Sequence, residues 1–312
     1  MSHLSYRLLV ATTIVLSWSA CDSQNVATNS SIPSSSHVRK LRSDRQWTEE
    51  TGMVFKEGPF IVNGGDANTA ETPWFVHFGN GACGASLISK TRVLTAAHCV
   101  RSGAPATVRV GATTQSDGTE IRVRCVKKHP NYDNFVTNDI AIIKLASEAP
   151  TDSFIAINTD AGNPSLGEQM TAIGLGRTSS NGGVASRLLA INVNYVDPGT
   201  CNIAYGGGVD SNFHLCATTN GNGVCNGDSG GPLYDSAFAQ VGVVSFGSSG
   251  GCGTGVPDGY TRVSHYSQWI QEQLTDDSCD GCSIYPTCAQ IFNSVVSAVT
   301  NAARYMFRGD IE

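Results

Sequence analysis

Three short motifs place a histidine, an aspartate and a serine in that order along the chain, and they restrict the fold more than any other feature. The motifs are residues 95–99, which hold His98, residues 138–141, which hold Asp139, and residues 225–232, which hold Ser229. A neutral hydroxyl becomes a nucleophile when an imidazole takes its proton and a carboxylate orients that imidazole. An aspartate at the start of a buried strand also needs a polar partner, and the ring N–H of His98 would supply one.

In these motifs and in their order, the chain resembles the trypsin/chymotrypsin family of serine proteases over residues 61–274. The resemblance implies an all-β protein with two antiparallel six-stranded β-barrels, a C-terminal helix and a Cys-containing helical tail. It also implies a serine endopeptidase that hydrolyses peptide bonds through an acyl-enzyme. The alternative is a secreted, protease-like binding or inhibitor protein with little or no activity. Such relatives lose triad residues, whereas this chain keeps all three.

The family's catalytic roles carry over to the matching positions. Ser229 would attack the substrate carbonyl, His98 would carry the proton, and Asp139 would hold the imidazole in the right tautomer. The backbone N–H groups of Gly227 and Ser229 would form the oxyanion hole. The other interpretation of Asp139 is an aspartate that caps a turn. Four further histidines lack such a setting and are expected to be surface or structural residues: His77, His129, His214 and His265.

Residues 61–65, Ile-Val-Asn-Gly-Gly, resemble the amino terminus that this family exposes when its zymogen is cut. The freed α-ammonium of Ile61 would turn inward and pair with Asp228, because a buried carboxylate without a cation is costly. Phe60 precedes the bond to be cut, where trypsin-activated relatives have lysine or arginine. The sequence therefore predicts activation by cleavage after an aromatic residue.

A specificity pocket is expected beside the serine. Its predicted substrate-binding residues are Gly223, Val224, Ser245, Phe246, Gly247 and Asp258. Gly223 at the base of the pocket, with Asp258 on the opposite wall, resembles the brachyurin-type proteases. This combination implies a roomy pocket for aromatic and large apolar side chains that also accepts lysine or arginine through Asp258. The alternative is that Asp258 faces solvent in a loop. Residues 245–247 would offer backbone groups to an extended substrate.

Eleven cysteines without paired CxxC sets favour disulfides formed in an oxidising, extracellular setting. The resemblance implies the pairs Cys83–Cys99, Cys201–Cys216 and Cys225–Cys252. Cys125 alternates with Ile121 and Val123, so the three side chains share one face of a strand. Two interpretations of Cys125 remain open, a bond to a cysteine of the tail or a free buried thiol. No metal or other cofactor is expected.

The two ends of the chain differ in composition from its centre. Arg7 and the apolar run after it predict a signal peptide over residues 1–20, and the run is shorter than the ~18 apolar residues of a membrane span. Polar, serine-rich residues 21–60 predict a pro-segment. Within it, residues 39–42 resemble the RxLR motif of secreted pathogen effectors, and the alternative is a solvated charge run. The expected product is a secreted monomer.

Ser264 is predicted to cap a short helix with one apolar face, formed by Tyr266, Trp269, Ile270 and Leu274. Residues 275–312 form a predicted C-terminal extension with Cys279, Cys282 and Cys288 and a helical stretch. That stretch would pack on the protease's own surface or, alternatively, act as an autoinhibitory or partner-docking helix. The net charge of −6 gives no reason to expect nucleic acid or an acidic membrane as a partner. Protein and peptide substrates and protein inhibitors are the expected partners.

Overall fold

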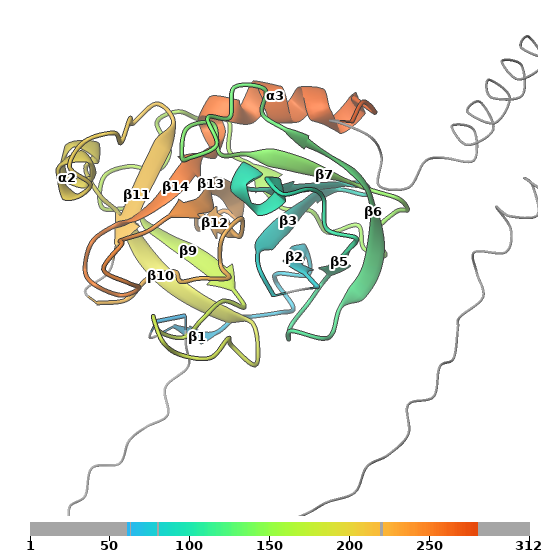
Figure 1. Ribbon diagram of the computed structural model, residues 1–312, viewed down its shortest axis with the longest axis horizontal. Helices are drawn as coiled ribbons and strands as arrows, with labels where there is room; N and C mark the ends of the chain where they lie inside the picture. Colours follow the sequence, from blue (N-terminus) through green and yellow to red (C-terminus); the bar gives the residue numbers. More distant parts are fainter. Residues whose placement is uncertain (1–60, 63, 80, 219–220, 280–312) are drawn as a thin grey trace, which may run out of the picture. The chain divides into compact units, whose positions relative to one another are not determined.

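The computed structural model describes residues 61–279, apart from residues 63, 80, 219 and 220, and these residues are mainly β-structure (Figure 1). The predicted signal peptide, the predicted pro-segment and the tail beyond Cys279 lie outside the described residues. Among the described helices, none is long and apolar enough to cross a membrane.

The first barrel is closed by six antiparallel strands in the order β2–β3–β4–β7–β6–β5. The strands are β2 (Phe75–Phe78), β3 (Gly84–Ser89), β4 (Arg92–Thr95), β5 (Thr107–Val110), β6 (Thr119–Lys128) and β7 (Ala141–Leu145). The alternation predicted for β6 is confirmed, since Ile121, Val123 and Cys125 are all buried. Closure leaves no free sheet edge in this barrel and surrounds a single apolar interior.

The second barrel closes in the order β9–β10–β11–β14–β13–β12, with β12 pairing back to β9. The strands are β9 (Gln169–Gly174), β10 (Leu189–Tyr195), β11 (His214–Thr218), β12 (Pro232–Tyr234), β13 (Ala239–Phe246) and β14 (Asp258–Arg262). Two short strands are added to it, β1 (Gly65–Asp66) beside β10 and β8 (Ala156–Ile157) beside β13. The predicted architecture of two six-stranded antiparallel barrels is confirmed.

Two α-helices are described, α2 (Pro198–Ala204) and α3 (Val263–Thr275). In α3, Tyr266 and Ile270 are buried on the predicted apolar face. The prediction that Ser264 caps this helix is wrong. The β14 ladder continues to Arg262, so the helix begins directly after it and Ser264 lies within the first turn. Its hydroxyl has no hydrogen-bond partner in the described part of the chain.

Among the described residues, four disulfides are present: Cys83–Cys99, Cys125–Cys279, Cys201–Cys216 and Cys225–Cys252. Three of them are the pairs that the family resemblance implies. The fourth joins Cys125 to a cysteine of the predicted tail, so Cys125 is not a free thiol. This bond links β6 of the first barrel to the segment that follows α3.

Candidate active site

His98 and Asp139 are brought together by neighbouring strands of the first barrel. β4 leads into the 3₁₀ helix η2 (Ala97–Val100), which carries His98, and Asp139 lies two residues before β7. β4 and β7 are paired, with Thr95 opposite Ala141. The Nδ1 of His98 lies 2.7 Å from Oδ2 of Asp139, and the His98 backbone N–H donates to Oδ1 at 2.8 Å. The carboxylate is fully buried and therefore fixes the ring.

Asp139 also accepts two hydrogen bonds from the second barrel, which the sequence did not predict. The Ser245 hydroxyl donates to Oδ2 of Asp139 at 2.6 Å, and the Thr261 hydroxyl donates to the Asp139 carbonyl at 2.8 Å. Both residues come from the second barrel, on β13 and β14. Ser245, predicted only as a substrate-binding residue, therefore also holds the carboxylate from across the two barrels.

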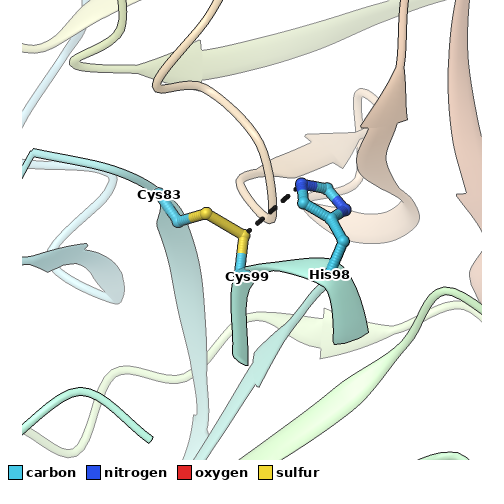
Figure 2. A group of neighbouring side chains, drawn as sticks. All are labelled: Cys83, His98 and Cys99. Carbon is cyan, nitrogen blue, oxygen red and sulfur yellow. Dashed lines mark hydrogen bonds between the residues drawn. A yellow bond between two sulfur atoms is a disulfide. The ribbon is translucent and has the colours of Figure 1, made fainter. Parts of the chain in front are cut away.

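The other ring nitrogen of His98 faces the Cys83–Cys99 disulfide (Figure 2). Nε2 lies 3.7 Å from Sγ of Cys99, and the potential ligand atoms of the three residues lie within 4.8 Å of one another. Metal binding by cysteine requires a thiolate, and both sulfurs are instead joined to each other. This group is therefore a disulfide packed beside an imidazole and not a metal site.

Ser229 lies half-buried in the loop before β12, at the wall of a pocket. The Ser229 carbonyl accepts the N–H of Gly84, which ties the loop to β3. Gly227 has a φ of +101°, and a Cβ there would lie 2.9 Å from Cα of Gly176, so only glycine fits. Among the described residues, the N–H groups of Gly227 and Ser229 have no acceptor. They are the two donors predicted to form the oxyanion hole.

Asp228 is fully buried between these two residues. Its carboxylate accepts the N–H of Gly176 at 2.8 Å and that of Cys225 at 2.9 Å. Burial raises the pKa of Asp228 to about 7, and the two backbone hydrogen bonds oppose that rise. Within the described part of the chain, no side-chain cation is paired with this carboxylate.

Ile61 is 1% exposed and packs in the apolar core of the second barrel. The next residue, Val62, forms an antiparallel bridge with Gly223, five residues before Asp228. The chain segment that would begin at a cut before Ile61 is thus already seated against the loop that carries Asp228.

The pocket beside Ser229 has a volume of about 390 Å³. Five of the six residues predicted to bind substrate line it: Val224, Ser245, Phe246, Gly247 and Asp258. Gly223, the sixth of these residues, lies directly beside the Asp258 carboxylate, and its role as the base of the pocket stays a prediction. A Cβ on Gly223 would lie 2.3 Å from Oδ2 of Asp258, so the carboxylate occupies the space in front of this glycine. The other residues that line the pocket are Ser180, Cys225, Asn226, Ser229, Val244, Ser248, Ser249, Gly251 and Cys252.

Asp258 is 6% exposed, because it starts β14 and pairs with Ala217 of β11. The alternative that it faces solvent in a loop is therefore wrong. Its Oδ2 accepts the N–H of Val224 at 2.9 Å. Burial raises the pKa of Asp258 to about 7, the hydrogen bond from Val224 opposes the rise, and the nearby charge of Asp228 adds to it. A positive charge entering the pocket would meet a buried carboxylate.

The fold and the site together are those of the chymotrypsin-like serine proteases. They comprise two β-barrels, a buried His–Asp pair and a loop that carries a serine beside a pocket. The family profile described as Trypsin matches residues 61–270. Brachyurin of Leptuca pugilator is 37% identical over 201 residues, which cover 61% of this chain and 87% of that protein. Trypsin beta of Drosophila erecta is 35% identical over 222 residues, which cover 67% of this chain and 87% of that protein.

Among solved structures, that of neuropsin, a serine protease of mouse brain, matches with a TM-score of 0.63 and 29% identity. The match covers 69% of this chain and all of that one. The chain therefore belongs to the trypsin family, and it is a serine endopeptidase.

Proposed function

We propose that this endopeptidase acts through Ser229, His98 and Asp139. The Ser229 hydroxyl attacks the scissile carbonyl while His98 takes its proton and later gives it to the leaving amine. Asp139 keeps the imidazole oriented and stabilises it once it is charged. The N–H groups of Gly227 and Ser229 stabilise the oxyanion, a contribution of about 3–4 kcal/mol for each such donor. The observation that carries the proposal is the buried Asp139 carboxylate, held by His98 from one barrel and by Ser245 from the other.

The enzyme is made, in this proposal, as a secreted zymogen that is activated by cleavage between Phe60 and Ile61. Phe60 lies outside the described residues. Support comes from Asp228, a buried carboxylate that pairs with no side-chain cation among the described residues, and from Ile61, which is already buried in the same barrel. Four disulfides among the described residues fit an oxidising, extracellular location.

Labelling with a fluorophosphonate, before and after cleavage at Phe60–Ile61, tests both parts of the proposal. We expect Ser229 to be labelled rapidly only after the cut, and peptide mapping identifies the labelled residue. Labelling of the uncut chain at the same rate would support Ser229 as the nucleophile but contradict activation by cleavage. Absence of labelling in correctly cut protein would favour the protease-like binding protein instead.

The pocket, we further propose, accepts aromatic and large apolar P1 side chains and also lysine and arginine. Asp258 supplies the charge for the basic residues. Replacing Asp258 by asparagine keeps the size of the side chain and one oxygen for the Val224 N–H. Loss of one partner of a buried charge pair costs about 2–5 kcal/mol, so kcat/KM for P1 arginine should fall by about 10²-fold. Cleavage after phenylalanine serves as the internal control and should stay within about threefold.

The same substrates give a pH test of this assignment. Burial raises the pKa of Asp258 to about 7, and only the carboxylate form attracts a basic side chain. The ratio of kcat/KM for P1 arginine over P1 phenylalanine should therefore rise as the pH is raised through about 7. Effects of pH on the catalytic steps that the two substrates share cancel in the ratio. Equal losses on both substrates in Asp258→Asn, or a ratio that does not change with pH, would refute the role of Asp258.

A further inference from the structure

A row of three residues crosses neighbouring strands on one side of the first barrel. Arg92 on β4 lies directly opposite Lys144 on β7, and Lys144 lies opposite Cys125 on β6. Lys144 is 0% exposed and Arg92 is 6% exposed. Like charges directly across a sheet repel each other, and buried cations without partners are strongly destabilising. This row therefore requires a partner of opposite polarity.

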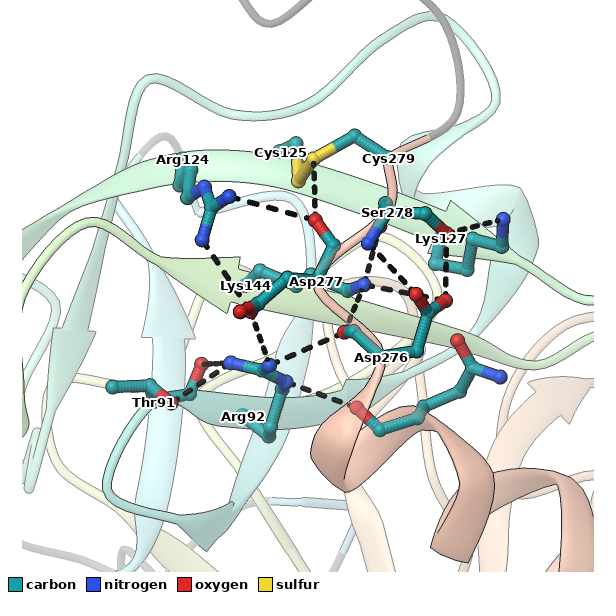
Figure 3. Close-up of a disulfide and its surroundings, with 11 residues drawn as sticks. Thr91, Arg92, Arg124, Cys125, Lys127, Lys144, Asp276, Asp277, Ser278 and Cys279 are labelled. Carbon is teal, nitrogen blue, oxygen red and sulfur yellow. Dashed lines mark hydrogen bonds and ion pairs between the residues drawn. A yellow bond between two sulfur atoms is a disulfide. The ribbon is translucent and has the colours of Figure 1, made fainter. Parts of the chain in front are cut away.

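Residues 276–279, which we call the strap, supply that partner after the end of α3 (Figure 3). The Lys144 ammonium donates to the carbonyl of Asp276 at 2.5 Å and also to the carbonyl of Ser278. The Asp276 carboxylate lies 3.6 Å away from it. The guanidinium of Arg92 donates to the Asp276 carbonyl at 3.2 Å and to the Asp277 carboxylate at 2.9 Å. Lys144 is thus satisfied by the strap, whereas Arg92 takes its carboxylate from the strap and also donates to the Gln273 carbonyl of α3 at 3.0 Å and to Thr91.

Further contacts hold the strap in this position. Arg124 of β6 lies 3.4 Å from the Asp277 carboxylate, and the Lys127 ammonium donates to the Ser278 hydroxyl at 3.1 Å. The strap is also ordered within itself, because the Asp276 carboxylate accepts both the N–H and the hydroxyl of Ser278. The Cys125–Cys279 disulfide then fixes its last residue to β6.

The segment from β14 to Cys279 contacts the two residues that lie shortly before β7 and also Lys144 near the end of that strand. At the Asp139 end, Tyr266 donates its hydroxyl to the side-chain carbonyl of Asn138 at 3.1 Å, and the Thr261 hydroxyl donates to the Asp139 carbonyl. At the opposite end, the strap holds Lys144. Since this segment follows directly from the second barrel, it connects that barrel to the strand beside Asp139.

We propose that the strap is a disulfide-locked positioning device that fixes β7, and with it Asp139, relative to the second barrel. Residues 276–279 then belong to the folded protease domain, four residues beyond the end of α3. This inference rests on the proposed role of Asp139 in catalysis. A loosened strap leaves Lys144 and Arg92 poorly paired, and β7 becomes less rigidly held next to His98.

The test uses the full-length chain carrying Cys125→Ala and Cys279→Ala, cut at Phe60–Ile61. We expect Tm to fall by about 5–15 °C, the range that loss of a disulfide gives in a domain of this size. Well below Tm, we expect kcat to fall by about three- to tenfold while KM stays within about twofold, because Asp139 is positioned less well. A normal kcat together with a lowered Tm would overturn the positioning role, and an unchanged Tm would overturn the strap itself.

A second variant separates the charge from the disulfide. Lys144→Met leaves the Cys125–Cys279 disulfide intact but removes the ammonium that donates to the strap carbonyls. Like the double cysteine variant, it should lower both Tm and kcat. Lys90→Met is the matched control, because Lys90 pairs with Asp152 at the surface of the same barrel and should have little effect. Equal results for the two variants would contradict the proposal. Lack of any activity in the unaltered cut chain would count against the proposed function, whereas Tm would still test the strap.

Discussion

Replacing Ser229 by alanine is expected to lower kcat of the cut enzyme by about 10⁴–10⁶-fold, with a much smaller effect on KM. The nucleophile, the base and the orienting carboxylate act as one unit, so loss of one member removes nearly the whole contribution of the three. The residual activity would come from the backbone N–H groups of residues 227 and 229 and from substrate binding in the pocket. The measurement is hydrolysis of a peptide amide with phenylalanine at P1.

His98→Ala and the double variant provide the check on this interpretation. The double variant should be no slower than either single variant by more than about tenfold, since the second substitution removes a group that has already lost its function. Ser179→Ala is a matched control for the serine-to-alanine change, because this serine is exposed and does not line the pocket. Retention of most of the activity in Ser229→Ala, with Tm unchanged, would assign the nucleophile to another residue.

Local sequence signals predicted those parts of the site that depend on neighbouring strands. His98 and Asp139 are each fixed by a short motif, and the antiparallel pairing of β4 with β7 brings the two motifs together. The positions of Gly227 and Ser229 follow from a loop of eight residues. For His98 and Asp139, the pair that the family resemblance implies is the pair that the structure contains.

Contacts between distant segments carried no such signal. Ser245 reaches Asp139 across 106 residues, and a serine in a strand-like stretch has many other possible roles. The contact between Gly223 and Asp258 joins distant segments in the same way. Counting back from Ser229 locates Gly223 along the chain, but it does not show that the carboxylate of Asp258, from another strand, fills the space in front of this glycine.

The strap was the least predictable feature. Lys144 stands in a continuous apolar run that suggests a buried strand, yet lysine is rarely buried without a partner. Its partners are backbone carbonyls more than 130 residues away, and a carbonyl has no identity in a sequence. Only the proposed bond from Cys125 to a tail cysteine indicated that the extension reaches the first barrel.

The second large effect is expected for Asp228→Asn, whose activity after cleavage before Ile61 should fall by about 10²–10⁴-fold. In the uncut chain this carboxylate is fully buried and its pKa is raised from 3.8 to about 7, chiefly by desolvation. Such a rise means that keeping this buried carboxylate charged at higher pH costs on the order of 4 kcal/mol. Breaking a buried ion pair costs a similar 3–5 kcal/mol. The new α-ammonium of Ile61 would offset this cost, and asparagine removes the charge with which it pairs.

The sign of the pH dependence follows from the same shift. Because folding raises the pKa of Asp228, the uncut chain binds more protons than its unfolded form between about pH 4 and 7, so this group makes stability fall as the pH rises through that interval. After the cut, the ammonium of Ile61 pairs with the carboxylate, and this pH dependence of stability should weaken. Asp228→Asn should lack the pH dependence in both the cut and the uncut form. Thermal unfolding at a series of pH values measures it.

A matched aspartate separates this effect from general destabilisation. Asp235 is also buried in the second barrel, at 6% exposure, but its side chain caps a turn by accepting the N–H groups of Ala237 and Ala239. Asp235→Asn should lower Tm while keeping the ratio of activity after and before the cut. Asp228→Asn should instead bring that ratio close to one, because the loop carrying Gly227 and Ser229 is no longer tied to the new amino terminus. If the ratio stayed high in Asp228→Asn, the cut would have to act through another carboxylate or through the removal of residues 21–60 alone.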